Sequence, residues 1–360
     1  MRESVKNFIK LLNENGIDAF ITNKPFTRQL FTGYRGISSK MDGQVLVDNT
    51  GVKLFVSRMN YEHAVAEADD KESITIVKYE SDYMASLGQL FVDKGYKKMA
   101  FEENFLSVKE LAGLKSKLPN TEFVYGTELI NKCKQKKTQE DLIQYRKVCT
   151  ITDEIWKRVL PVIKVGVTEK EVEAKILISM MELGADTTSF LPIVVSGARS
   201  SMPHGRPSEK RLENGDFVTV DMGFVLNGYT SDFTRTVVIG KASEKHRQIY
   251  DAVLRAQEAA LKGIKAGMTG KAGDEIARNI IDEAGYGEYF NHGLGHGFDD
   301  GVFLSKSGKD FILEENMVFT IEPGIYIEGF GGVRIEDTVI LSKDGCVSLF
   351  KSGKELIQIV

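Results

Sequence analysis

The chain contains one stretch twice: Leu212-Glu-Asn-Gly-Asp-Phe-Val-Thr-Val-Asp-Met-Gly223 is repeated as Leu313-Glu-Glu-Asn-Met-Val-Phe-Thr-Ile-Glu-Pro-Gly324. The same offset of 101 positions relates Gly166-Val-Thr168, which opens a helical pattern, to Gly267-Met-Thr269, which opens another. A duplicated helix-plus-hairpin unit places equivalent positions on facing sides of one cleft. The repeat therefore predicts a domain with internal two-fold pseudo-symmetry.

Acidic residues occupy matched places in the two copies. Asp221 aligns with Glu322, and Gly228-Tyr-Thr-Ser-Asp232 aligns with Gly332-Val-Arg-Ile-Glu336 after an insertion of three residues. Two unit charges ~4 Å apart repel by roughly 4 kcal/mol at an effective dielectric constant near 20. Four carboxylates in one cleft therefore need cations, and two divalent ions ~3.5–4 Å apart would neutralise them.

The first copy is predicted to place its two aspartates together. Phe217–Phe224 and Tyr229–Val238 have strand patterns, and Asn227-Gly228 between them is a two-residue hairpin turn. This turn sets position 232 opposite position 223, so Asp232 becomes a diagonal neighbour of Asp221. Either aspartate alone would be interpreted as an ordinary strand-end carboxylate. A charge on an otherwise apolar strand face is costly unless it is paired or binds a metal.

Histidine is supplied by the glycine-rich segment His292-Gly-Leu-Gly-His296-Gly. Glycine lets the backbone approach a ligand closely. We expect His296 to join the four carboxylates as a metal ligand, and His292 to support the ligands or face a substrate. Four oxygen ligands and one imidazole suit Mn²⁺, with Co²⁺, Zn²⁺ and Fe²⁺ left open.

The fold class is predicted to be α/β (α+β), with two domains. Residues 1–130 alternate between helical and strand patterns and form a small α/β domain, with helices predicted near 81–94 and 107–118. Residues 131–360 form the domain that contains the repeat. The polar, basic segment 129–140 is interpreted as the linker between the two domains.

Composition excludes several classes of protein. Hydrophobic residues make up 42%, charged residues 27%, and the formal net charge is −4, so nucleic acid is not expected as the main partner. No apolar run approaches the ~20 residues that cross a bilayer, so no membrane partner is expected. The cysteines Cys133, Cys149 and Cys346 are widely spaced, which is typical of reduced thiols in a cytoplasmic protein.

The motifs closely resemble the family of prolidase, aminopeptidase P and methionine aminopeptidase. The Leu30-Phe-Thr-Gly-Tyr34 segment also resembles the small N-terminal domain of the proline-specific and creatinase branches. The resemblance covers nearly the whole chain and implies a pita-bread catalytic domain. It rests on four motifs: Asp221-x10-Asp232, Gly-His296-Gly, Thr-Ile-Glu322-Pro-Gly and Gly-Val-Arg334-Ile-Glu336-Asp.

The resemblance implies a role for each predicted ligand. Asp221 would bind one ion, His296 and Glu322 the other, and Asp232 and Glu336 would bridge the two. Glu322 would also move a proton as the general base. The expected reaction is hydrolysis of the peptide bond preceding proline in peptides with proline at the second position. Dipeptides and longer peptides both remain open as substrates.

Two further residues acquire roles from the resemblance. His204, in Met-Pro-His204-Gly, matches a histidine that the family uses near the substrate. Arg334 would hold the substrate or Glu336, with a structural salt bridge as the simpler alternative. The family's tendency to dimerise implies a homodimer.

One position departs from the family pattern. Phe303 stands where the family carries a second active-site histidine, and no histidine follows His296. Such an imidazole contributes on the order of 10²–10³ in rate. His292, Asp299 and Asp300 are the candidates to replace it. Two alternatives therefore stay open: a weakened or silent family member that acts as a binding protein, and a creatinase-like hydrolase, against which the complete ligand set counts.

Overall fold

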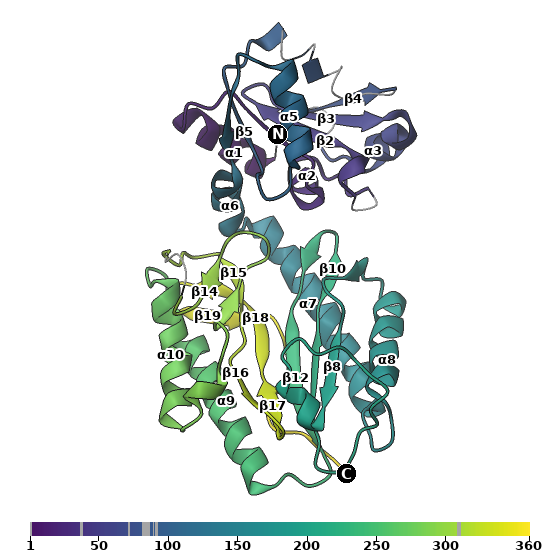
Figure 1. The fold of residues 1–360 in the computed structure, drawn as a ribbon, viewed down its shortest axis with the longest axis vertical. Helices are drawn as coiled ribbons and strands as arrows, with labels where there is room; N and C mark the ends of the chain where they lie inside the picture. The colour runs from purple at the N-terminus through teal and green to yellow at the C-terminus, as the bar shows by residue number, and fades with distance from the viewer. Residues whose placement is uncertain are drawn as a thin grey trace. The chain divides into compact units, whose positions relative to one another are not determined.

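The protein divides into two compact units, Met1–Lys134 and Gln135–Val360. The computed structural model describes residues 2–36, 39–70, 73–80, 87–88, 90, 93–307 and 311–360. Each unit has its own sheet and its own buried apolar core. Figure 1 shows helices and strands mixed in both units, so the predicted α/β class is confirmed.

The first unit is built on a six-stranded sheet in the order β4-β3-β2-β1-β5-β6. β2 and β3 form a hairpin, with Val47 opposite Val52. β1 pairs parallel with β5, and β5 parallel with β6, so crossover segments bury both faces of the sheet. The strands are β1 (Ala19–Thr22), β2 (Gln44–Asp48), β3 (Gly51–Ser57), β4 (Ile74–Tyr79), β5 (Lys98–Phe101) and β6 (Glu122–Tyr125).

Helices cover this sheet. The predicted helix at 107–118 is confirmed as α5, whereas most of the one expected near 81–94 lies outside the described residues. The segment 129–140, interpreted as the linker, contains the boundary between the two units and is mostly helical: α6 continues to Gln135, because Leu129 and Ile130 are buried in the apolar core of the first unit. The helices are α1 (Glu3–Glu14), α2 (Pro25–Thr32), α3 (Tyr61–Glu67), α5 (Val108–Lys117) and α6 (Thr127–Gln135).

The second unit is built on a seven-stranded sheet in which β15-β18-β12-β9-β8 are neighbours, while β19 pairs with β18 and β20 with β12. Smaller sheets join β7, β10 and β11, β13 and β14, and β16 and β17. The strands of the main sheet are β8 (Ile193–Ser196), β9 (Phe217–Met222), β12 (Phe233–Ile239), β15 (Val318–Ile321), β18 (Glu336–Ser342), β19 (Gly345–Ser348) and β20 (Gln358–Ile359). The shorter strands are β7 (Thr187–Thr188), β10 (Phe224–Leu226), β11 (Tyr229–Thr230), β13 (Gly295–His296), β14 (Phe303–Leu304), β16 (Gly324–Ile327) and β17 (Gly331–Arg334).

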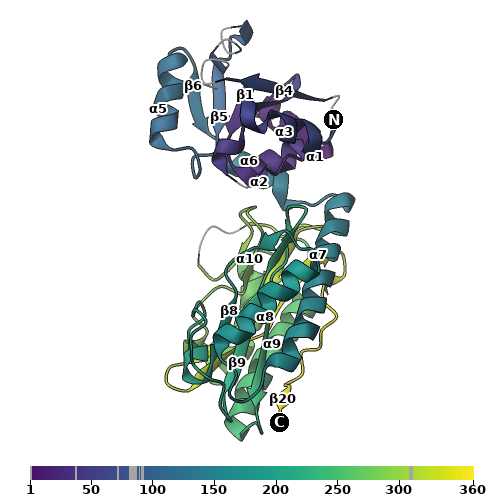
Figure 2. The same ribbon diagram turned by 90° about the vertical axis from the view of Figure 1, so that its right-hand side faces the viewer.

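Four long helices pack against the main sheet in two pairs. Figure 1 shows α7 and α8 beside β8 and β12, and α9 and α10 beside β15 and β16; Figure 2 shows α7 and α8 running side by side. Thr138 caps α7, and Asp141 completes a capping box. The helices are α7 (Gln139–Val159), α8 (Glu169–Glu182), α9 (Glu244–Gly263) and α10 (Gly270–Glu283). Short 3₁₀ helices are η1 (Lys40–Asp42), η2 (Arg58–Asn60), η3 (Leu160–Val162), η4 (Gly197–Ser201) and η5 (Gly287–Tyr289).

The predicted internal repeat is present as equivalent hydrogen bonds in two halves of this unit. Gly166 N donates to Leu212 O at 2.9 Å, and Gly267 N donates to Leu313 O at 2.8 Å. Isolated bridges likewise join Thr168 to Arg211 and Thr269 to Ile312. In each half, the start of a helix (α8 or α10) is hydrogen-bonded to the segment that precedes a strand of the main sheet (β9 or β15). The predicted pseudo-symmetry is therefore confirmed.

The predicted hairpin forms, but each of its strands is interrupted. Asn227 and Gly228 both have positive φ, at 50° and 82°, as the expected turn requires. The pairing of Met222 with Phe233 sets position 232 opposite position 223, as predicted. The first strand is interrupted at Gly223. A Cβ atom there would lie 2.2 Å from Ser189 Oγ, so the neighbouring loop that contains Ser189 occupies the space that a side chain would need.

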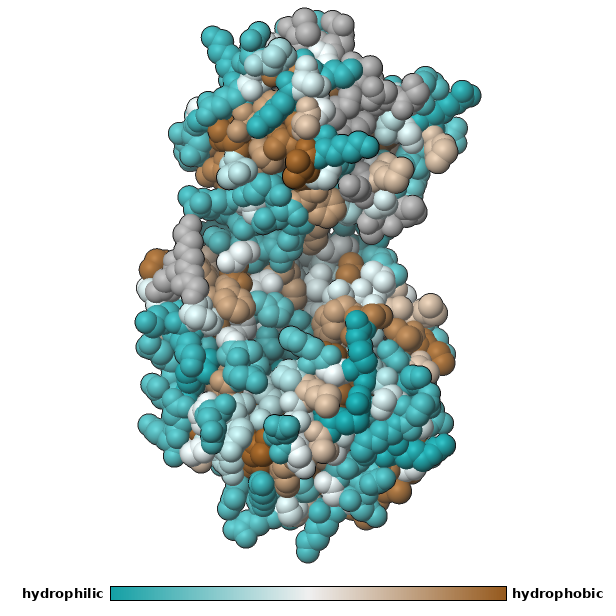
Figure 3. All heavy atoms as spheres, in the orientation of Figure 1, coloured by the Kyte–Doolittle hydropathy of each residue, from teal (hydrophilic) through white to brown (hydrophobic). Residues whose placement is uncertain are grey.

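The surface is largely polar on the faces that Figure 3 shows, with scattered apolar side chains. Among the described residues, no helix combines the length and the apolar character needed to span a membrane.

Candidate metal centre

The main sheet gathers four of the predicted ligands at its middle. The end of β9 lies beside the start of β12, the start of β12 beside the start of β18, and the start of β18 beside the end of β15. Antiparallel pairing therefore brings the carboxylates of both halves to one place. The positions are Asp221 in β9, Asp232 directly before β12, Glu322 directly after β15 and Glu336 at the start of β18.

The short strand β13 contributes the imidazole of His296 to this group. The backbone N of His296 donates to Thr320 Oγ1 at 2.9 Å, and the N of Glu322 donates to Leu294 O at 2.8 Å. Gly295 permits this approach, because a Cβ atom there would lie 1.9 Å from Thr320 O. Gly295 therefore allows close packing of two backbone segments, whereas the sequence predicts that glycine here allows close approach to a ligand.

His296 reaches into the group of carboxylates. Its Nε2 lies 3.3 Å from Glu322 Oε1 and 3.8 Å from Asp232 Oδ2. Its Nδ1 lies 3.1 Å from Gly297 O, which assigns a proton to Nδ1 and makes Nε2 the ring nitrogen that faces the carboxylates. Asp232, His296 and Glu336 each offer one ligand atom, and these atoms all lie within 4.8 Å of one another.

Burial and mutual repulsion perturb the carboxyl groups. The pKa of Asp232 is raised well above its ordinary value by burial and by the charges of Asp221 and Glu322. The pKa of Glu336 is raised by burial and by the charge of Asp232. Burial also raises the pKa of Glu322, although His296 and Arg334 oppose that shift. A cation among these groups would remove the cost of holding them ionised together.

The residues present fit divalent cations. Asp221 Oδ1 is buried and has no hydrogen-bond partner, whereas Oδ2 of the same carboxylate accepts from Arg334 Nη2 at 2.5 Å. An unpartnered buried carboxylate oxygen is costly in a protein interior, and a divalent cation bound there would satisfy it. Carboxylate oxygens with one imidazole nitrogen are a donor set for hard or borderline divalent ions.

Arg334 contacts Asp221 directly and is connected to Glu336 through Thr234. Besides Asp221, its guanidinium donates to Tyr326 OH at 2.8 Å, to Thr234 Oγ1 at 3.2 Å and to Pro203 O at 3.4 Å. Burial lowers the pKa of Arg334, but the neighbouring tyrosine and carboxylates outweigh it and raise the pKa well above the ordinary value. Its contacts make it a support for Asp221 from the second half of the unit.

His292 is engaged at both ring nitrogens. Nδ1 lies 2.7 Å from Gly293 O, and Nε2 lies 2.9 Å from Tyr326 OH. Because Arg334 donates to the tyrosine oxygen, the hydroxyl proton points to His292 Nε2. Burial lowers the pKa of His292 to about 4, so the ring is neutral at pH 7. These contacts leave neither nitrogen directed at a substrate.

The loop between β8 and β9 carries His204, whose side chain is exposed. The charge of His204 lowers the pKa of His292, which places the two imidazoles near each other. Phe303 also lies at this centre: β14 pairs it directly with His296, and its side chain is 48% exposed. Of the residues considered as replacements for a second histidine, Asp300 is fully buried in an ion pair with Lys137 at 2.7 Å.

Two threonines and a tyrosine near the ligands were missed in the sequence. Thr234 Oγ1 donates to Glu336 Oε2 at 2.6 Å, and Thr338 Oγ1 accepts from the backbone N of Asp232 at 3.0 Å. The sequence does contain a pattern that could have identified both threonines, because each lies two residues after a predicted ligand in its own copy of the repeat. Tyr326 had no such signal, because a lone strand tyrosine is ordinary.

Comparison with known proteins agrees with this geometry. Residues 143–343 match the metallopeptidase family M24, and residues 5–135 match the creatinase/prolidase N-terminal domain. The chain belongs to metallopeptidase family M24. The resemblance found in the motifs is thereby confirmed, and M24 membership implies divalent metal ions as cofactors.

Full-length relatives share this M24 architecture. The Xaa-Pro dipeptidase of Pyrococcus furiosus is 37% identical, over 99% of this chain and 100% of its own. The structure of a prolidase from Pyrococcus horikoshii has a TM-score of 0.90 at 37% identity and covers 99% of this chain and 100% of that one. An X-Pro aminopeptidase structure from Thermotoga maritima has a TM-score of 0.88 at 32% identity, covering 97% and 100%. The predicted pita-bread catalytic domain is confirmed by these likenesses.

Proposed function

We propose that this chain is a dinuclear metallopeptidase that hydrolyses the bond preceding proline in peptides with proline at the second position. The observation that carries the proposal is the convergence of Asp232, His296 and Glu336 within 4.8 Å, beside Asp221 with its unpartnered buried oxygen. The proline preference is supported by relatives named Xaa-Pro dipeptidase and X-Pro aminopeptidase.

Each proposed ligand takes its role from the family resemblance. Asp221 would hold one ion, His296 and Glu322 would hold the other, and Asp232 and Glu336, one from each half, would be shared between the two. When bound, such ions lower the pKa of water toward neutrality and polarise the carbonyl of the bond to be cleaved. Arg334 keeps Asp221 in place through the 2.5 Å contact at Oδ2, which leaves Oδ1 for the ion.

Glu322 is the general base in this proposal. Its Oε1 accepts from Thr320 Oγ1 at 3.0 Å, and its pKa is raised by burial. A raised carboxyl pKa makes the group a better proton acceptor at neutral pH. His204 is exposed on its loop and is assigned to contact the substrate, whereas His292 acts through Tyr326 and Arg334.

We further propose manganese as the native ion, a homodimer as the assembly and the cytoplasm as the location. Oxygen-rich donors with one imidazole support manganese over softer ions. Three free cysteines, Cys133, Cys149 and Cys346, support a reducing compartment.

The test uses metal-free chain reloaded with Mn²⁺, Co²⁺ or Zn²⁺. Xaa-Pro dipeptides, Xaa-Pro-Yaa tripeptides and matched Xaa-Ala peptides are offered, and release of the first residue is measured. We expect metal-dependent cleavage of proline peptides alone, and the two peptide lengths separate dipeptidase from aminopeptidase. Cleavage without metal supports the creatinase-like alternative. No cleavage of any proline peptide by loaded chain supports the silent binding protein.

A further inference from the structure

The two halves of the catalytic unit meet through a short junction. β12 and β18 are paired at Phe233 with Asp337 and at Thr234 with Glu336, although each strand is seven residues long. Both bridging carboxylates depend on this junction, because Thr234 donates to Glu336 and Thr338 contacts the backbone of Asp232. A shift of one strand against the other would change the spacing of the carboxylates.

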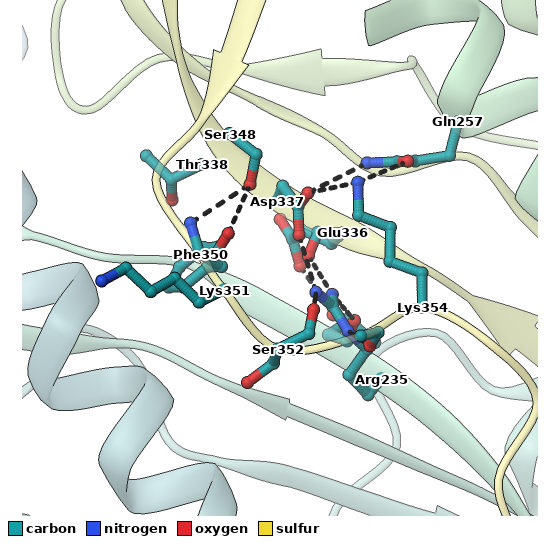
Figure 4. A network of polar contacts seen from close by, with 12 residues as sticks. Arg235, Gln257, Glu336, Asp337, Thr338, Ser348, Phe350, Lys351, Ser352 and Lys354 are labelled. Carbon is teal, nitrogen blue, oxygen red and sulfur yellow. Dashed lines mark hydrogen bonds and ion pairs between the residues drawn. The ribbon is translucent and has the colours of Figure 1, made fainter.

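Arg235 clamps the junction from the opposite face of the sheet. Its Nη1 donates to Thr234 O at 2.9 Å and to Glu336 O at 2.7 Å, the carbonyl groups of one paired position. Nη2 donates to Asp337 Oδ1 at 2.9 Å and Ser352 O at 3.0 Å, and Nε to Gly353 O at 2.9 Å. A guanidinium has five N–H donors, and all five are used here. Figure 4 shows Arg235 beneath Glu336 and Asp337.

Asp337 connects this arginine to the C-terminal segment. Its side chain is fully buried, and its Oδ2 lies 2.7 Å from Lys354 Nζ and accepts from Gln257 Nε2 at 3.4 Å. Successive residues of a strand point to opposite faces, so Glu336 faces the metal centre while Asp337 faces Arg235 and Lys354. Figure 4 shows these groups converging on one point behind the strand.

A contribution to folding stability does not by itself explain why these charged side chains are buried together. The side chains of Arg235 and Asp337 are 3% and 0% exposed. A buried ion pair often contributes no more stability than apolar residues of the same volume, because taking charges out of water is costly. Its directional hydrogen bonds do fix geometry, and here they end on the backbone of a proposed bridging ligand.

We propose that Arg235, Asp337 and Lys354 form a positioning cluster that sets the separation of Asp232 and Glu336 across the junction. The proposal rests on the proposed dinuclear centre. The cluster touches neither ion nor substrate. It acts through the carbonyl groups of Thr234 and Glu336, and the C-terminal segment completes it by supplying Lys354.

The test is Mn²⁺ binding to the full chain by calorimetry, with electron paramagnetic resonance to detect magnetic coupling between the two bound ions. Lys354→Gln removes one charge of the cluster, and Arg235→Lys leaves three donors in place of five. The matched control is Lys351→Gln, on the same segment with an exposed side chain. Outer-shell changes of this kind weaken metal binding roughly 10–100-fold.

We expect both cluster variants to bind Mn²⁺ roughly 10-fold or more weakly and to lose or alter the coupling signal, with the control unchanged. Folded variants with wild-type affinities and an unchanged signal overturn the positioning role. If Arg235→Lys fails to fold, Lys354→Gln decides, because this lysine is partly exposed. A wild-type chain that binds fewer than two ions overturns the proposed function first, and the positioning role with it.

Discussion

The two halves of the catalytic unit share a scaffold but differ in how they hold the loops near the metal centre. In the first half, α8 begins with Glu169; at the matching place in the second half, α10 begins with Gly270. Glu169 is fully buried, with Oε1 accepting from Ser196 N at 2.7 Å and Oε2 from Ser208 N at 2.9 Å. It therefore ties both ends of the loop that carries His204.

Gly270 leaves room for the second loop to approach. A Cβ atom at this position would lie 3.0 Å from Phe303 O and 3.0 Å from the Phe311 ring. One loop is thus held by a buried charge and the other by direct contact with a helix start. The comparison teaches that the ligand-bearing strands of the two halves are alike, while the loops near the proposed metal centre differ and present His204 on one side and Phe303 on the other.

The prediction with the largest expected effect tests whether the two halves contribute equivalent metal ligands. Asp232→Asn and Glu336→Gln should each reduce kcat/KM for a Xaa-Pro peptide on the order of 10³-fold, because each removes several kcal/mol of metal-dependent stabilisation. The control is Asp216→Asn, a buried aspartate paired with Lys210. If either ligand variant keeps near wild-type activity with bound metal, the two carboxylates are not equivalent.

The next effect tests the difference between the loops. Glu169→Gln should destabilise the chain by about 3 kcal/mol in denaturant unfolding, because it leaves buried donors and Arg199 without their charged partner. It should also raise KM, since the loop of His204 loses its anchor. The control is Glu171→Gln, two residues along in the same helix turn, for which little change is expected. Equal effects of the two variants would deny Glu169 this role.

A smaller effect is expected from Phe303→His. Since both ring nitrogens of His292 are engaged, that residue does not replace a second imidazole near the scissile bond. We expect the new histidine to raise kcat/KM roughly 10-fold, below the 10²–10³ of a fully preorganised donor. Phe303→Leu, which keeps an apolar side chain, is the control. A decrease in kcat/KM would instead show that the phenylalanine itself binds substrate.

The smallest effect concerns pH. In the metal-free fold the raised pKa values of Asp232 and Glu336 mean that the folded chain binds more protons than the unfolded chain. These groups therefore contribute stability below the ordinary carboxyl pKa, and lose it as pH rises through the raised values. Mn²⁺ competes with those protons, so its increase of Tm should be about 5 °C larger at pH 8 than at pH 5. An equal increase at both pH values would contradict this.

Most of the proposed metal ligands could be predicted from the sequence, because the internal repeat contains the same pattern of residues twice. The match of Asp221 with Glu322 and of Asp232 with Glu336 identifies four carboxylates as candidate ligands from the sequence alone. The turn Asn227-Gly228 set the strand register, since a one-residue slip would reverse every side chain. The helical conformation of the segment 129–140 was not predicted. The boundary between the two units lies in this segment, which is largely helical because apolar residues spaced among its lysines pack against the first unit's core.

The sequence by itself determined the two-fold architecture and the five groups proposed as ligands, because the repeat and the motifs are properties of the chain, and the same motifs carried the resemblance to the family. Only the tertiary structure decided which partners those groups have. Arg334 donates directly to Asp221 and reaches Glu336 through Thr234, and the ring nitrogens of His292 contact Tyr326 and Gly293. The cluster of Arg235, Asp337 and Lys354 joins residues up to 119 positions apart. Such contacts depend on side-chain direction across packed strands, which no local pattern records.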